Sequence, residues 1–177
     1  MRDNIIFDKN RLQYLLHTFL QEIDAAGVVG TVHLVGGAAL SLYYFDRDAT
    51  RDIDAGFPQD PRITPVILDI AKREDLPLNW INSDSAMFFG FPPSKYWLSV
   101  KKIGNIELKV ASPELLLAMK LKASRGRRDN EDAIELLAIC NFVSVEQVIA
   151  VYEEVYAQEV LKESAMEMLQ YHFGVIS

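Results

Sequence analysis

Two adjacent glycines, Gly36 and Gly37, separate a β-branched segment from a helical one. Residues 31–35 (TVHLV) favour a strand, and residues 38–45 favour a helix. A strand that passes through a glycine turn into a helix is typical of folds in which helices cover a sheet, so an α/β (α+β) fold is predicted. Such a turn can also hold a phosphate, because glycines let the backbone approach an anion and a helix start offers free N–H groups. A tight turn without a ligand explains the same pattern.

The segments around this unit predict a mixed sheet flanked by helices. Apolar residues recur at helical spacing after Asp8, which can cap a helix, and the helix is expected to stop at Gly27. The further elements expected in this part of the chain are a strand at residues 51–57, a helix at 63–74, and strands at 96–103 and 106–110 that form a hairpin at Gly104 and Asn105.

The last third of the chain predicts helices only. Ser112, Pro113 and Glu114 combine a capping serine, a proline at the first helical position and an acid in the first turn. Helices are expected at residues 113–125, at 129–140 after an interruption at Gly126, and at 144–173 with one break. We therefore expect an α/β core at residues 1–111 and a C-terminal helical segment at 112–177, packed together as one compact unit.

Composition excludes several classes of protein. The 177 residues carry a net charge of −7, yet residues 91–130 hold nine basic and three acidic side chains, a tract that can bind a phosphate-bearing ligand or simply form a solvated lysine face. No apolar run approaches the roughly 20 residues that span a bilayer, so we expect no membrane partner and a cytoplasmic location. The single cysteine excludes an internal disulfide, and the three histidines lack the spacing of a structural zinc site.

Two aspartates alternate with apolar residues in the segment RDIDAGF. Because side chains of a strand alternate between its faces, Asp52 and Asp54 are expected on one face and Ile53 and Ala55 on the other. Two like charges held close together are costly unless a cation lies between them, and paired carboxylates suit Mg²⁺. The other interpretation is a strand end that faces solvent.

These motifs in this order resemble a known family. Gly-Gly-Ala-Ala-Leu at residues 36–40, followed by Thr-Arg-Asp-Ile-Asp at residues 50–54, resembles the nucleotidyltransferases of the DNA polymerase beta superfamily. The similarity is greater to the bacterial branch that contains abortive-infection and toxin–antitoxin nucleotidyltransferases. Downstream, a helix that carries a lysine and is followed by an arginine and aspartates resembles the same branch. The resemblance covers roughly residues 31–57 and 106–137.

The resemblance implies roles for individual residues. Asp52 and Asp54 would bind Mg²⁺ and act with Lys120 in catalysis, and a third carboxylate is implied for which Glu107 is the candidate. A surface pair of Glu107 with Lys109 is the competing explanation. The residues implied in nucleotide binding are Gly36, Gly37, Thr50, Lys120, Arg125, Asp129 and Asp132.

The resemblance also implies a function. The chain would be a Mg²⁺-dependent nucleotidyltransferase that uses a nucleoside triphosphate and modifies the hydroxyl of a tRNA end, a protein side chain or a small molecule. Its setting could be a toxin with a cognate antitoxin. The main alternative is a catalytically inactive binding or regulatory protein of the same fold, an antitoxin or a nucleotide sensor, which Ala38 favours because many members have a serine or threonine there. A third is an interaction module in which the motifs coincide by chance.

Overall fold

The computed structural model describes residues 6–46, 50–90, 92–123 and 127–176, without the side chains of residues 127–129. Its contacts divide the chain into two units. The sheet unit consists of Met1–Ala86 and Leu98–Val110, and the helical unit consists of Met87–Trp97 and Ala111–Ser177. The predicted α/β architecture, a mixed sheet with helices and an all-helical C-terminal part, is confirmed.

The sheet has five strands in the order β3-β2-β1-β5-β4. The central strand β1 is antiparallel to β2 and parallel to β5, and β2 is parallel to β3. The predicted strands and the predicted hairpin are present, and β3 adds a short edge strand. The strand bounds are Gly30–Leu34 for β1, Ile53–Gly56 for β2, Ile81–Asn82 for β3, Trp97–Ile103 for β4 and Ile106–Ala111 for β5.

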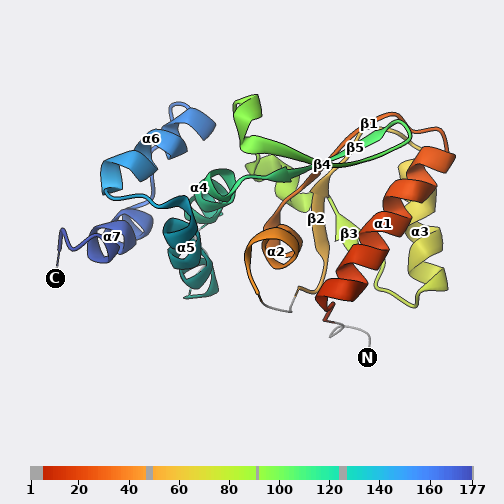
Figure 1. Cartoon of the computed structure of the whole chain (residues 1–177), viewed down its shortest axis with the longest axis horizontal. Coiled ribbons are helices and arrows are strands. Elements are labelled where there is room, and N and C mark those ends of the chain that lie inside the picture. Colours follow the sequence, from red (N-terminus) through yellow and green to blue (C-terminus); the bar gives the residue numbers. More distant parts are fainter. Residues whose placement is uncertain (1–5, 47–49, 91, 124–126, 177) are drawn as a thin grey trace. The chain divides into compact units, whose positions relative to one another are not determined.

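Two helices, α1 (Lys9–Ala25) and α3 (Ile63–Arg73), lie side by side in the sheet unit (Figure 1). The predicted cap of α1 is confirmed, because the backbone N–H of Arg11 donates to Asp8 Oδ1 at 2.7 Å. The apolar face of α1 is fully buried, and Phe19 on this face meets the rings of Phe57 and Trp80 edge-on. Burial of this face is the main stabilising term for α1.

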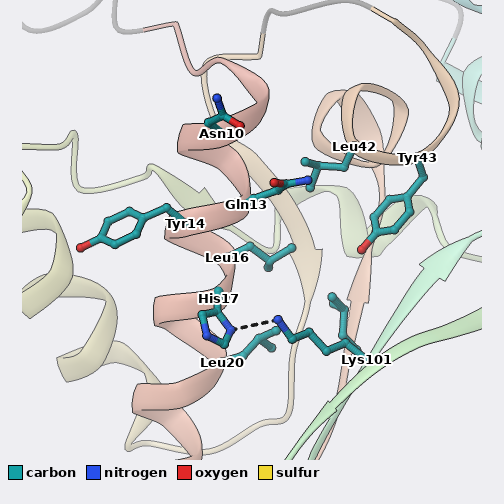
Figure 2. A pocket seen from close by; sticks show the side chains of 10 residues that line it. Asn10, Gln13, Tyr14, Leu16, His17, Leu20, Leu42, Tyr43 and Lys101 are labelled. Atoms are coloured by element: carbon teal, nitrogen blue, oxygen red, sulfur yellow. Dashed lines mark hydrogen bonds between the residues drawn. The ribbon is translucent and has the colours of Figure 1, made fainter.

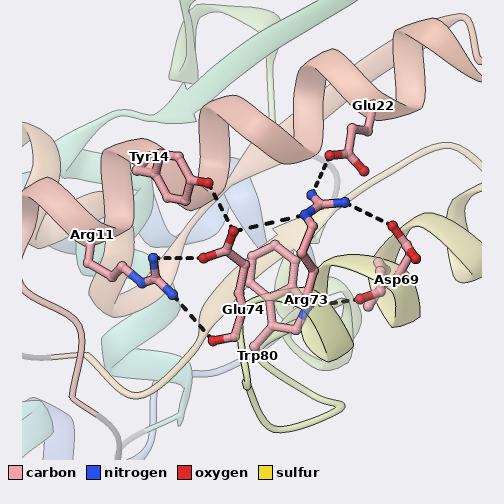
Figure 3. A network of polar contacts seen from close by, with 8 residues as sticks. Arg11, Tyr14, Glu22, Asp69, Arg73, Glu74 and Trp80 are labelled. Carbon is pink, nitrogen blue, oxygen red and sulfur yellow. Dashed lines mark hydrogen bonds and ion pairs between the residues drawn. The ribbon is translucent and has the colours of Figure 1, made fainter.

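A polar network joins α1 to α3 above this apolar contact (Figure 3). The Arg73 guanidinium bridges Glu22 of α1 at 2.5 Å and Asp69 of its own helix at 2.9 Å. Glu74 accepts hydrogen bonds from the Tyr14 hydroxyl and the Arg11 guanidinium, and these two donors lower the pKa of its carboxyl. Because Arg11, Arg73 and Asp69 are each more than a third exposed, their ion pairs fix the register of the two helices more than they add stability.

The helix after the glycines begins two residues earlier than predicted and changes its geometry. It starts as α2 (Gly36–Ala39) and continues as a π-helical segment, η1 (Leu40–Tyr44). The N–H of Phe45 donates to the carbonyl of Leu40 at 2.7 Å, five residues back, where the segment ends. The predicted helix is therefore confirmed, with a widened second half of a kind that is frequent at functional sites.

The helical unit contains the predicted C-terminal helices. Ser112 starts the first of them, because its hydroxyl accepts the N–H of Leu115 at 3.3 Å. The predicted break in the last segment falls between Val155 and Glu163, and the predicted interruption at Gly126 lies outside the described residues. The bounds are Pro113–Ala123 for α4, Arg127–Cys140 for α5, Val145–Val155 for α6 and Glu163–His172 for α7.

Residues 87–97 precede β4 in the chain, yet their contacts group them with the helices. The Tyr96 hydroxyl donates to Glu154 of α6 at 2.5 Å, and the Tyr156 hydroxyl donates to the carbonyl of Phe88. Lys95 forms an ion pair with the same Glu154 carboxylate at 2.7 Å. The segment is thus held by side chains about sixty residues away in sequence.

Within the described ranges, no single helix is long and apolar enough to cross a membrane.

Candidate functional site

One face of the sheet carries polar side chains on four neighbouring strands. Residues paired across strands point to the same face, so the register assigns each side chain to a side. Asp54 of β2 pairs with Asn82 of β3, and its carbonyl accepts the N–H of Val35 at the end of β1 at 3.0 Å. The alternating residues Ile53 and Ala55 are fully buried. The ladder therefore places Asp54 on the face opposite to Ile53 and Ala55, as the sequence predicts, whereas Asp52 directly precedes β2.

The glycine turn lies directly against the Asp54 side chain. Gly36 has a φ of +63°, and a Cβ at this position would overlap the Asp54 carboxylate and lie 3.0 Å from its Cβ. No other residue fits, because a side chain would be strained in this backbone conformation and would also displace the carboxylate. The start of the helix and one of the two predicted metal ligands are thus in van der Waals contact.

The second glycine packs on Thr50 in the same way. A Cβ at Gly37 would lie 2.7 Å from Thr50 Oγ1. The Thr50 hydroxyl is nearly buried and donates to the carbonyl of Asp52 at 3.0 Å, and the Thr50 carbonyl accepts the N–H of Phe7 at 2.8 Å. Thr50 therefore positions the backbone that carries the two aspartates. Its predicted role in nucleotide binding stays a prediction.

Asn82 is a site residue that the sequence reasoning missed. Its side-chain amide donates to Asp52 Oδ2 at 3.2 Å, and its Oδ1 accepts the N–H of Asp84 at 3.0 Å. The second bond fixes the amide plane, so that the first can orient the Asp52 carboxylate. The signal that could have revealed Asn82 is a polar residue directly after the buried pair Trp80 and Ile81 at the end of a strand.

The remaining polar residues of this face come from β1 and β5. Thr31 pairs with Glu107, and His33 pairs with Lys109. Partial burial, followed by the nearby Lys109 ammonium, lowers the pKa of His33, so its imidazole is neutral at neutral pH. Glu107 accepts a hydrogen bond from the Ser99 hydroxyl at 2.7 Å and lies 3.8 Å from Lys109 Nζ. These contacts fit the alternative explanation, a surface pair of Glu107 with Lys109. The role of Glu107 as a metal ligand stays a prediction.

The chemistry of the aspartate pair fits Mg²⁺. This ion commonly binds proteins through one or two carboxylates and keeps several of its waters, so Asp52 and Asp54 suffice as protein ligands. In the part of the chain that the structure describes, no three His, Cys, Asp or Glu side chains are grouped to hold a metal ion. Any Mg²⁺ at this face would therefore rely on the two aspartates, on water and on the oxygens of a substrate.

The downstream candidates belong to the helical unit. Lys120 of α4 and Asp132 of α5 form an ion pair with 2.8 Å between Nζ and Oδ2. The Asp132 side chain is 2% exposed and that of Lys120 19%, so this pair is largely desolvated. Arg125 lies outside the described residues, as does the side chain of Asp129. The predicted roles of all four residues towards a nucleotide stay predictions.

We expect Asn82→Ala to weaken Mg²⁺ binding at the predicted site without unfolding the protein. Loss of a hydrogen bond that orients a metal ligand typically costs roughly ten- to a hundredfold in metal affinity or activity. The measurement is the Mg²⁺ concentration that gives half-maximal nucleotide binding, with Asn130→Ala on the exposed side of α5 as the matched control. If Asn82→Ala lowers thermal stability but leaves the Mg²⁺ dependence unchanged, Asn82 only holds β3 in place.

A comparison with protein families finds a match over nearly the whole chain. A family model described as a nucleotidyltransferase of unknown function (DUF6036) matches residues 13–176. The match spans both the polar face of the sheet and the four C-terminal helices. No curated protein matches the chain, and no solved structure does.

Proposed function

Since the chain belongs to this family of nucleotidyltransferases of unknown function, we propose that it transfers a nucleotidyl group from a nucleoside triphosphate to an acceptor hydroxyl. The observation that carries the proposal is the contact of Gly36 with Asp54, which joins a phosphate-type glycine turn to a paired carboxylate. In such a transfer the acceptor oxygen bonds to the α-phosphorus and its hydroxyl proton passes to water, while the bond from that phosphorus to the bridging oxygen breaks and pyrophosphate leaves.

Asp52 and Asp54 would hold Mg²⁺ in this reaction. When bound, the ion would neutralise the charge of the phosphates and orient the reacting oxygens. Asn82 orients the Asp52 carboxylate through its amide. The glycines would let backbone N–H groups approach the phosphates, because Gly36 and Gly37 carry no side chains of their own. Lys120 would contact a phosphate, and Glu107 would be a third metal ligand. The other residues proposed to bind the nucleotide are Thr50, Arg125, Asp129 and Asp132.

The contact between the glycine turn and the Asp54 carboxylate favours an enzyme over a catalytically inactive protein of the same fold. A protein that only bound a macromolecular partner would not need two carboxylates beside a glycine that tolerates no side chain, and transfer of label separates an enzyme from a nucleotide sensor. Ala38 in place of a serine or threonine is compatible with a cradle built from the backbone alone. The acceptor in this proposal is a tRNA end, a protein side chain or a small molecule, and the setting is the toxin of a two-gene system with a cognate antitoxin, by resemblance only.

The proposal predicts that nucleotide binding requires Mg²⁺. Two carboxylates repel a triphosphate until a cation neutralises them, so calorimetry with ATP, CTP, GTP and UTP should detect binding with Mg²⁺ and lose it with a chelator. The nucleotide bound most tightly, labelled at the α-phosphate, then serves as the donor in a cell extract, where label should appear in one class of acceptor. Binding that is unaffected by the chelator would contradict the role of Asp52 and Asp54.

A further inference from the structure

A cavity of about 470 Å³ lies in the sheet unit among α1, η1 and the β4–β5 hairpin (Figure 2). This volume is within the usual range of small-molecule sites. Its apolar wall consists of leucines of α1, η1 and β5, and its polar groups are those of Asn10, Gln13, Tyr14, His17, Tyr43 and Lys101. The cavity therefore combines a hydrocarbon surface with several hydrogen-bonding groups.

The cavity is on the other side of the sheet from the aspartate pair. Leu108, which lines it, alternates along β5 with Glu107 and Lys109 and is buried with Val32 opposite it. Glu107 and Lys109 share the face of Asp54 by the register of β1, so Leu108 points to the opposite face. Occupation of the cavity is thus separate from the proposed triphosphate site.

The charge of the cavity is unlike that of the chain as a whole. Acidic residues outnumber basic ones by 25 to 18 in the sequence, yet none of the described residues that line the cavity is acidic. The Lys101 ammonium lies 3.1 Å from His17 Nδ1 and so donates to an imidazole nitrogen (Figure 2). A cation whose partner at the cavity is a ring nitrogen and not a carboxylate can still bind a carboxylate or a phosphate.

We propose that this cavity binds a small organic anion. The charged group lies at Lys101, where a charge-assisted hydrogen bond is available, and the Tyr43 hydroxyl and the Gln13 amide can bind further oxygens. The hydrocarbon part packs on the leucines, including Leu42 and Leu108. The shared chemistry is an anionic head on an apolar body, as in a carboxylate or a phosphate monoester of a short hydrocarbon.

The test uses the full chain and the fluorescent anion anilinonaphthalene sulfonate as the probe. We expect the probe to bind the folded protein at one site per chain and to be displaced by octanoate or by octyl phosphate, whichever head group is preferred. Octanol, which lacks the charge, and inorganic phosphate, which lacks the hydrocarbon, should displace it poorly. Binding should not depend on Mg²⁺, which separates this site from the proposed triphosphate site.

Substitutions locate the site. Lys101→Gln should weaken probe binding by about tenfold, the usual size of one charge-assisted hydrogen bond. Lys102→Gln is the matched control, because Lys102 is its exposed neighbour on β4 and does not line the cavity. Equal affinity in Lys101→Gln and the unmodified protein would overturn the proposal, as would displacement by octanol that matches displacement by octanoate.

Discussion

Asp54→Asn is expected to lower the rate of nucleotidyl transfer by roughly a thousandfold, because a metal-bound carboxylate contributes several kcal/mol to stabilising the transition state. The substitution keeps the shape of the side chain that packs on Gly36, so the fold should be retained. It removes one of the two charges that would hold Mg²⁺. The measurement is the initial rate of label transfer at saturating nucleotide, together with a thermal melt of both proteins.

Asp69→Asn is the matched control for this experiment. It makes the same chemical change on α3, where the Asp69 side chain is 67% exposed and pairs with Arg73. We expect its transfer rate to equal that of the unmodified protein. If the chain acts as a toxin, induced expression should arrest growth with Asp69→Asn and not with Asp54→Asn. Transfer by Asp54→Asn at the rate of the control would remove Asp54 from the mechanism.

Asp132→Asn should destabilise the protein by about 3 kcal/mol. The change removes the negative charge that lies 2.8 Å from Lys120 Nζ in a largely desolvated place, and breaking a buried ion pair typically costs about this much. For a chain of this length such a loss lowers the melting temperature by roughly 6 to 12 °C. The free energy of unfolding from urea titration is the direct measurement.

The pair of Lys122 and Glu159 provides the control for this prediction. It joins the same helix α4 to the loop after α6, but its side chains are 24% and 47% exposed. Glu159→Gln should therefore cost less than about 1 kcal/mol, as exposed ion pairs do. Equal costs for Asp132→Asn and Glu159→Gln would show that the Lys120–Asp132 pair stabilises the fold no more than an exposed ion pair does.

The elements that the sequence predicts correctly are those with strong local signals. Asp8 caps α1 and Gly27 follows its end, and the hairpin turns at Gly104 and Asn105 as expected. The alternation around Ile53 predicts the two faces of β2, because one face of a strand in a covered sheet must be apolar. Local patterns of this kind need no knowledge of what packs against them.

The features that the sequence does not predict depend on contacts between distant segments. Asn82 contacts Asp52 only because β3 pairs with β2 in one particular register. The ion pair of Lys120 with Asp132 depends on how α4 and α5 pack, and one such lysine cannot be distinguished from a phosphate ligand by spacing alone. The two faces of one strand could thus be predicted, whereas the contacts of its residues with distant segments required the tertiary structure.

The helical unit is made of two separate segments of the chain, and this determines which fragments can contain the whole unit. The chain enters that unit at Met87, leaves it after Trp97 and enters it again at Ala111. A fragment that begins at Ala111 would therefore lack the Tyr96 hydroxyl that donates to Glu154 and the Phe88 carbonyl that accepts from Tyr156. No single cleavage separates the two units intact. A fragment for isolating the helical unit would need residues 87–97 fused to residue 111 by a linker that replaces the β4–β5 hairpin.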